Sequence, residues 1–231
     1  MLERPALGKH KDDLRSNTHL LRGFGMKNGF FALLCTVSLA ACGSGGGGGG
    51  GATSSVNPPI SSAPSANYFP IASSNAWTYQ GGLNYGMGNS FAFQGQTVYP
   101  YQGGCNATEY LYKDSSGNVF SIGQTINGVG SPKPYPQPDL LVKSQLSSGM
   151  TWNNNLGFVT ESVSVGNPVN VTINGSNATG YPISYTDNYS PPVTATIIYV
   201  ANIGPVQVPN FCASPFVSEN LTSYSVSPTS I

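Results

Sequence analysis

The chain has 231 residues, equal numbers of acidic and basic side chains, and a charged fraction of only 8%. A soluble domain usually has ~25% charged residues, so this composition argues against a coiled coil, a highly charged disordered chain and a polyanion-binding surface. Six of the nine basic residues and both histidines come before residue 28. After Cys42 the chain contains no histidine and no arginine. It has three lysines and six carboxylates there, which gives this part a net charge of −3.

The missing histidine and arginine exclude several functions. Ser-His-Asp and Cys-His catalysis and nearly all zinc sites depend on histidine. Nucleic-acid binding depends on basic side chains that meet phosphates. We therefore expect a protein without metal, cofactor or nucleic-acid partner.

The N-terminal region has the pattern of an export signal. Lys27 follows Met26, and an apolar run covers residues 30–41. This run is too short to cross a bilayer, which takes ~20 residues, but it suits the apolar part of a signal peptide. It ends in Leu39-Ala40-Ala41-Cys42, after which Gly43 and Ser44 lead into a glycine run at residues 45–51.

The segment Leu39-Ala40-Ala41-Cys42 resembles the lipobox of bacterial lipoproteins. The resemblance implies cleavage before Cys42 and acylation of its thiol with lipid chains such as palmitate, and several chains anchor a protein durably. Gly43 in place of aspartate favours export to the outer membrane, with the protein facing the periplasm or the surface. The alternative is a simple signal peptide cleaved near Ala41, with Cys42 incidental.

These signals divide the chain into four parts. Residues 1–25 look neither secretory nor foldable, so translation starts at Met26 or the basic region is unusually long. Residues 26–41 are the predicted lipoprotein signal peptide. Residues 42–67 are rich in Gly, Ser and Pro and should form a flexible, disordered tether, because they have little apolar surface to bury. Residues 68–231 are the predicted folded domain.

The predicted folded domain, residues 68–231, is called the body below. It is predicted to be an all-β domain with a single antiparallel sheet, in the form of a half-barrel or a sandwich. No segment shows sustained helical periodicity, and short β-rich runs stand between Gly, Asn and Pro residues. The predicted strands are Ala76–Gln80, Ser90–Tyr99, Thr108–Lys113, Val119–Ile122, Gly157–Val165, Val169–Ile173, Tyr181–Thr186, Val193–Val200, Val206–Val208 and Thr222–Val226.

Turns and loops complete this prediction. Asp114–Asn118 is expected to connect a hairpin, and Asn174-Gly175 is a strong turn signal because both residues tolerate positive φ. The stretch Pro132–Pro138 is predicted to be a loop. Glu109 and Lys113 alternate with apolar residues, and we expect them on the outward side of their strand.

Two cysteines remain in the body, Cys105 and Cys212. In an oxidising periplasm they would form a disulfide that closes a loop of about a hundred residues, worth up to ~4–5 kcal/mol in the chain-entropy model. The alternative is two free buried thiols. Two cysteines without histidine supply too few ligands for a metal.

Short aromatic motifs resemble a bacterial envelope family of β domains that open with Tyr-Phe-Pro-Leu, Gly-Asn and Trp-x-Tyr. The resemblance covers about residues 68–208 and implies a fold and a location but no activity. The segments that carry it are Tyr68-Phe69-Pro70-Ile71, Asn75-Ala76-Trp77-Thr78-Tyr79, Pro138-Asp139-Leu140-Leu141, Leu146–Trp152, Asn174–Tyr181 and Tyr199–Val206.

Aromatic residues offer the main candidates for a binding site. Trp77 and Trp152 suit either a place in the β core or a platform for a ligand. All thirteen tyrosines follow residue 67, many of them beside Gly, Pro, Asn or Ser. This mixture suits a surface for a neutral sugar or an apolar ligand, and equally an ordinary β domain.

We expect a lipid-anchored, non-catalytic envelope protein whose β domain has a binding or structural role, with a lipid, a glycan or an envelope protein as partner. One alternative is a lipid or lipoprotein carrier with an apolar cavity. Another is a carbohydrate-binding or carbohydrate-active surface protein, which as a hydrolase would need two facing carboxylates. No Gly-x-Ser-x-Gly elbow is present, and we expect no enzymatic activity.

Overall fold

The computed structural model describes residues 66–103, 107–125, 130–157, 159–213 and 217–227. Residues 1–65, with the predicted signal peptide, Cys42 and nearly all of the tether, lie outside them. The strands are β1 (Ala76–Tyr79), β2 (Asn84–Met87), β3 (Phe91–Phe93), β4 (Gln96–Gly103), β5 (Ala107–Lys113), β6 (Val119–Thr125), β7 (Lys133–Val142), β8 (Thr151–Asn155), β9 (Thr160–Val165), β10 (Val169–Ile173), β11 (Ser176–Asp187), β12 (Thr194–Val200), β13 (Gly204–Asn210) and β14 (Val217–Ser225).

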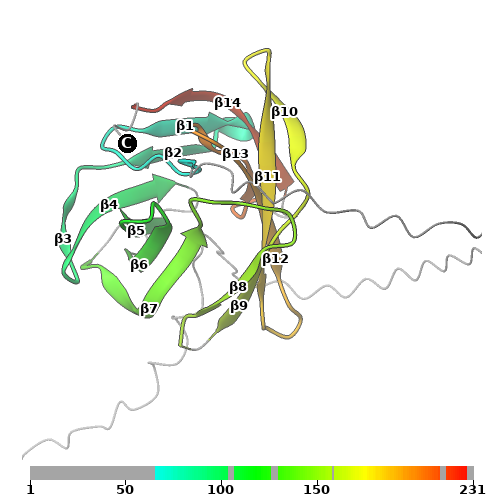
Figure 1. The fold of residues 1–231 in the computed structure, drawn as a ribbon. Coiled ribbons are helices and arrows are strands. Elements are labelled where there is room, and N and C mark those ends of the chain that lie inside the picture. The colour runs from blue at the N-terminus through cyan, green and yellow to red at the C-terminus, as the bar shows by residue number, and fades with distance from the viewer. Residues whose placement is uncertain (1–65, 104–106, 126–129, 158, 214–216, 228–231) are drawn as a thin grey trace, which may run out of the picture. The chain divides into compact units, whose positions relative to one another are not determined.

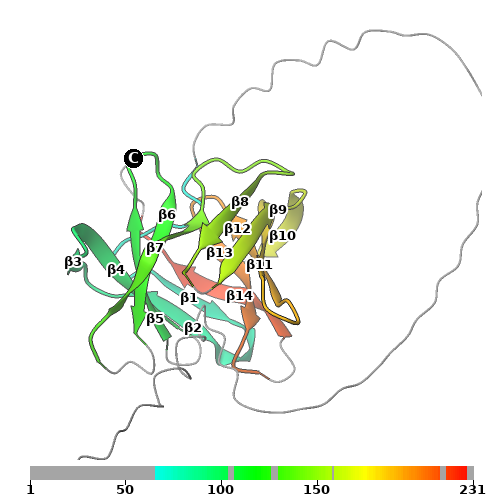
Figure 2. The same ribbon diagram turned by 90° about the horizontal axis from the view of Figure 1, so that it is seen from below.

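The strands form one antiparallel sheet that curls until it is nearly closed. Its order is β7-β6-β5-β4-β2-β1-β14-β13-β12-β11-β9-β8, with β3 paired to β4 and β10 to β11. Figure 2 shows the early strands β3–β7 on one side and β8–β13 on the other. The pairing of β1 with β14 joins these two halves (Figure 1). The all-β, single-sheet prediction is therefore confirmed, in its curled form.

Local turn chemistry agrees with the sequence at both predicted hairpins. Asn174 and Gly175 have φ of 51° and 78° and join β10 to β11. Asp114 joins β5 to β6, where its Oδ1 accepts hydrogen bonds from the backbone N–H groups of Ser116 and Asn118 at 3.0 and 2.8 Å. Ala66, at the end of the predicted tether, already contacts the domain, because its N–H donates to the carbonyl of Ser144 at 2.8 Å.

The prediction of a loop at Pro132–Pro138 was wrong, because β7 runs through it. Pro134, Pro136 and Pro138 stand at every second position, so their nitrogen atoms, which carry no hydrogen, point to the same side of the strand. Strand β7 ends the sheet and has its ladder with β6 alone. A strand with one free side tolerates proline there, since no backbone hydrogen bond is lost.

The predicted strand Ser90–Tyr99 contains a turn that divides it into β3 and β4. Gln94 and Gly95 have φ of 52° and 76°, and Phe93 pairs with Gln96 across the turn. The resulting hairpin places Phe91 and Phe93 against Tyr110 on the outer face of the sheet, with ring centroids 5.5 and 5.6 Å from the tyrosine ring.

With the β3–β4 hairpin over the outer face of the sheet, the side chains of β5 point to the opposite faces from those expected. Tyr110 packs outward with Val98 and Ile122, whereas Leu111 belongs to the main core. Glu109 shares the inner face with Leu111, as the alternation of a strand requires. Lys113 also turns towards the domain, where its Nζ donates to Asn67 Oδ1 at 2.7 Å. The expected outward orientation of Glu109 and Lys113 was therefore wrong.

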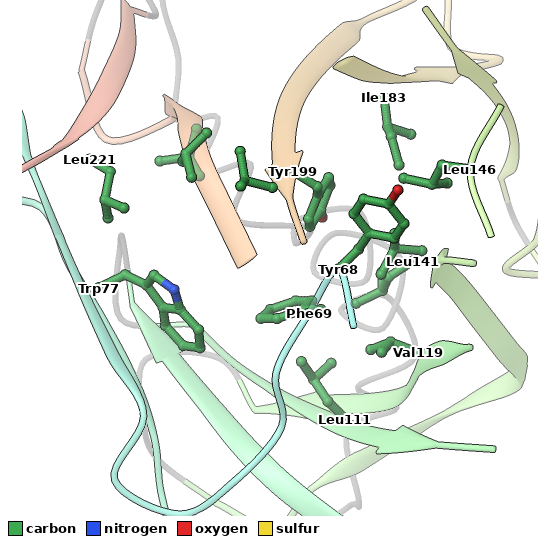
Figure 3. Packing of buried hydrophobic residues seen from close by; sticks show 14 of the residues in the cluster. Tyr68, Phe69, Trp77, Leu111, Val119, Leu141, Leu146, Ile183, Tyr199 and Leu221 are labelled. Atoms are coloured by element: carbon green, nitrogen blue, oxygen red, sulfur yellow. The ribbon is translucent and has the colours of Figure 1, made fainter. Parts of the chain in front are cut away.

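The interior of the curl is filled by the segment that precedes β1. Phe69 is 3% exposed, and its ring lies 5.7 Å from Trp77, 5.2 Å from Tyr101 and 6.0 Å from Tyr199 between ring centroids. Figure 3 shows Phe69 between Trp77 on one side and Leu141 on the other. Aromatic pairs at such separations add to the free energy gained by burial.

Side chains join the two ends of the sheet. The amide of Asn154 in β8 pairs with Leu140 in β7 like a backbone group: its Oδ1 accepts from the Leu140 N–H, and its Nδ2 donates to the Leu140 carbonyl, both at 3.2 Å. Trp152 Nε1 donates to the same carbonyl at 2.9 Å. Asn154 Nδ2 also donates to the buried carboxylate of Glu161 at 3.0 Å. We call this contact of Leu140, Trp152, Asn154 and Glu161 the closure seam.

The closure seam gives a direct prediction. Asn154→Ala leaves polar groups of Leu140 and Glu161 without this partner, and we expect the free energy of unfolding to fall by about 1–3 kcal/mol. Chemical denaturation measures the change. Asn153→Ala is the matched control, because Asn153 is exposed on the same strand, and it should change the stability little. Equal effects of the two variants would contradict a special role of Asn154.

Candidate functional site

One pocket opens on the inner side of the curl, between its two halves. Strands β2, β4 and β5 supply Tyr85, Tyr101 and Glu109, and β11 and β12 supply Tyr185 and Tyr199 from the other half. Its volume is about 100 Å³. We call it the aromatic pocket, because six of its lining side chains are Phe69, Tyr85, Tyr101, Tyr185, Tyr199 and Phe211.

The rings of Tyr85 and Tyr101 form one wall of the aromatic pocket. They stack with centroids 5.2 Å apart and an interplanar angle of 18°. Gly103, which pairs with Tyr85 across β2 and β4, makes room for this arrangement. A Cβ atom at Gly103 would lie 1.9 Å from Tyr85 Cδ1, so the glycine is needed for the close approach of the tyrosine ring.

The opposite wall is held by tyrosine hydroxyls. Tyr185 donates to the carbonyl of Leu141 at 2.7 Å, and its hydroxyl lies 3.3 Å from that of Tyr199. Tyr79 donates to the carbonyl of Pro205 at 2.7 Å behind the pocket. The bonds of Tyr185 to Leu141 and of Tyr79 to Pro205 join strands from different halves of the chain, so the pocket wall and the fold depend on the same contacts.

Glu109 is the one carboxylate among the described residues that line the aromatic pocket. It pairs with Tyr101 across β4 and β5. Burial, followed by the negative charge of Glu109, raises the pKa of Tyr85 to about 12. Burial also raises the pKa of Tyr101 well above its usual value, and neighbouring tyrosines and Glu109 add to the rise. Both phenols therefore stay neutral at physiological pH.

The pocket wall depends on Gly103, which can be tested. Gly103→Ala must displace the Tyr85 ring, and overpacking of this kind costs about 1–3 kcal/mol of stability. Gly86→Ala on β2 is the control, because its Cβ would lie 3.8 Å from the nearest atom, an ordinary contact. Thermal or chemical unfolding should show a loss for the first variant alone. A neutral Gly103→Ala would show that the ring does not occupy this position.

The two predicted tryptophan platforms lie outside the pocket lining. Trp77 is 0% exposed, and its Nε1 donates to the carbonyl of Ile203 at 2.6 Å. With no exposed face, Trp77 acts as a core residue. Trp152 is partly buried in the closure seam, where Lys143 Nζ lies 5.2 Å from its ring centroid. Its ring contacts a cation of the protein itself.

Of the predicted cysteine pair, Cys212 follows β13 and is disulfide-bonded. Cys105 lies outside the described residues, so its pairing with Cys212 stays a prediction. The described neighbours are compatible with it, because Gly103 and Ala107 on one side and Phe211 on the other line the same pocket.

The other buried carboxylates have structural contacts. Asp139 and Glu161 are each 1% exposed. Asp139 precedes Leu140 in β7, and Glu161 in β9 belongs to the closure seam. Neither lines the aromatic pocket. Among the described residues, no group of three or more His, Cys, Asp or Glu side chains is placed to hold a metal ion. No helix in the described ranges has the length and apolarity needed to cross a membrane.

A second, wider hollow of about 400 Å³ lies between β10 and the strands β12–β14. The residues that line it include neither an aromatic nor a charged side chain. Two of its amides bind each other, since Gln207 Nε2 donates to Asn220 Oδ1 at 2.8 Å. It therefore lacks groups that would hold a ligand by stacking or by charge.

Sequence reasoning identified the richness in tyrosine but missed the pocket. The sequence shows Tyr85 beside a glycine, Tyr101 beside a proline and Tyr199 within a predicted strand. That these three rings line one pocket depends on strand pairings between distant parts of the chain, which the sequence does not show. Glu109 was missed because the cover of β5 by β3 was not foreseen. No family model matches the chain, and no curated protein or solved structure matches it. The aromatic pocket itself is therefore the basis for a functional assignment.

Proposed function

We propose that the protein is a lipid-anchored, non-catalytic component of the bacterial envelope whose β domain binds a small ligand. The observation that carries the binding role is the aromatic pocket, with its six rings and one carboxylate. Binding sites for small molecules are concave, mostly apolar and fitted with few polar groups, and the aromatic pocket has this character.

The size of the pocket bears on the alternatives. Pockets that enclose drug-sized molecules measure about 300–1,000 Å³, whereas a cavity of about 150 Å³ holds benzene. At about 100 Å³, the aromatic pocket suits a single small group better than a whole lipid, which disfavours the carrier. Among the described residues of its lining, Glu109 is the one carboxylate, which disfavours a hydrolase that needs two.

The binding role predicts that filling the pocket abolishes binding. Ala107 is 8% exposed and lines the pocket, so Ala107→Leu should place a larger side chain there. Ala178→Leu on β11 is the control outside the pocket. Ligand-observed NMR with a panel of small sugars, short alcohols and small amines should detect binding to the wild type and the control but not to Ala107→Leu. Unchanged binding by Ala107→Leu would contradict the site, and no binding by the wild type would contradict the function.

The anchor is proposed from the lipobox-like segment. Mass spectrometry of the chain extracted from envelopes should give a mature protein that begins at Cys42 and carries acyl chains. Cys42→Ser should lose the lipid mass, whereas Cys35→Ser, within the apolar run that is cleaved off, should keep it. An unmodified chain cleaved near Ala41 would contradict the anchor.

A further inference from the structure

We infer that the ligand of the aromatic pocket is a small uncharged molecule with an acceptor oxygen, to which the phenolic hydroxyls of Tyr85 and Tyr101 donate hydrogen bonds. The inference rests on the proposed binding function, because it names the ligand class of the same site. Three properties of the pocket carry it: its hydroxyls, its apolar lining and its size.

Two phenolic hydroxyls in the pocket wall, those of Tyr85 and Tyr101, have no hydrogen bond to the described part of the chain. We call them the open hydroxyls. Both side chains are partly buried. Among the described residues every fully buried side-chain oxygen has a hydrogen-bond partner, so the open hydroxyls are reachable by solvent. A ligand that covers them must offer a partner in return, because an unpaired buried hydroxyl costs free energy.

Neighbouring tyrosine hydroxyls are already used by the fold. Tyr185, on the opposite wall, donates to the carbonyl of Leu141 at 2.7 Å, and Tyr79, behind the pocket, donates to the carbonyl of Pro205 at 2.7 Å. A tyrosine hydroxyl has a single proton to donate, so these two have none left for a ligand. The open hydroxyls differ from them in this respect.

The open hydroxyls keep their protons and therefore act as donors. Burial, followed by the charge of Glu109, raises the pKa of Tyr85 to about 12, and burial raises the pKa of Tyr101 well above its usual value. A phenol is more acidic than an alcohol, which makes it a better hydrogen-bond donor than acceptor. The matching group of the ligand is thus an acceptor oxygen, and an ammonium group, which only donates, does not match.

The lining around the open hydroxyls favours an uncharged and mostly apolar ligand. Leu141, Ile197 and Val208 present aliphatic carbon beside the aromatic rings, and none of the described lining residues is a lysine or an arginine. An anionic acceptor would lose its water there without a positive side chain in exchange. The volume of about 100 Å³ is below the ~150 Å³ of a cavity that holds benzene, so the group that enters is no larger than a small ring.

The test combines two ligands with a variant that removes the open hydroxyls, by NMR titration of the full chain in a polyoxyethylene detergent. Cyclopentanone has the acceptor oxygen, and methylenecyclopentane has a CH₂ group in its place. In Tyr85→Phe/Tyr101→Phe the affinity for cyclopentanone should fall about three- to tenfold relative to that for methylenecyclopentane, the contribution of a neutral hydrogen bond. Partition of each ligand into the detergent is the same for every variant and cancels in this comparison.

Tyr112→Phe is the matched control. Tyr112 is a partly buried tyrosine outside the pocket lining, where its ring stacks on Phe120 with centroids 5.2 Å apart. Its replacement should leave the relative affinity of the two ligands unchanged. If the double variant fails to fold, infrared difference spectra of the wild type decide: donation from a phenol should lower the carbonyl stretching frequency of bound cyclopentanone below its value in hexane, and an unshifted band would overturn the inference.

Cyclopentanol distinguishes two sources of the acceptor oxygen. Tighter binding of cyclopentanol than of cyclopentanone indicates a hydroxyl compound such as a sugar, and weaker binding indicates a carbonyl compound. Either result agrees with the inference if Tyr85→Phe/Tyr101→Phe weakens the oxygen-bearing ligand relative to methylenecyclopentane.

The inference fails if the double variant leaves that relative affinity unchanged, or if the wild type binds neither cyclopentanone nor cyclopentanol. In each case the proposed binding function survives if the NMR panel detects another ligand that Ala107→Leu excludes. If the panel also shows no ligand, the function and the inference fail together.

Discussion

The packing of Phe69 inside the curled sheet is the interaction on which the rest of the structure depends. A sheet that is nearly closed needs side chains in its interior, and the segment before β1 supplies them. Phe69 meets Trp77 and Tyr101 from the first half of the sheet and Tyr199 from the second. One ring therefore joins both halves, and it also lines the aromatic pocket.

Closure of the sheet is the second constraint, and it uses polar groups. Backbone ladders hold the sheet from β7 round to β8, but the two end strands meet through the side chains of Trp152 and Asn154. Across the described residues, no fully buried side-chain nitrogen or oxygen lacks a hydrogen-bond partner. Tyr185 belongs to both features, because its hydroxyl reaches Leu141 in β7 while its ring lines the pocket. A ligand in the pocket should therefore stabilise the closed sheet as well.

The sequence predicted what depends on local chemistry. The Asn174-Gly175 turn, the Asp114 turn and the alternating strands follow from backbone preferences and a period of two. It did not predict β7, because the prolines of Pro132–Pro138 indicate a loop unless the strand is known to end the sheet. The orientation of Glu109 depended on a turn at Gln94-Gly95 that carries β3 over the outer face. The pocket depended on long-range pairings such as Trp77 with Tyr224, which no local pattern specifies.

The most direct measurement of the central claim is a crystal structure of the protein soaked with a small ligand that the NMR panel detects. The account predicts that the ligand lies against Tyr85 and Tyr101 in the aromatic pocket, with Phe69 still packed between Trp77 and Tyr199. A ligand bound outside the aromatic pocket, or a Phe69 ring that does not lie between Trp77 and Tyr199, would contradict it.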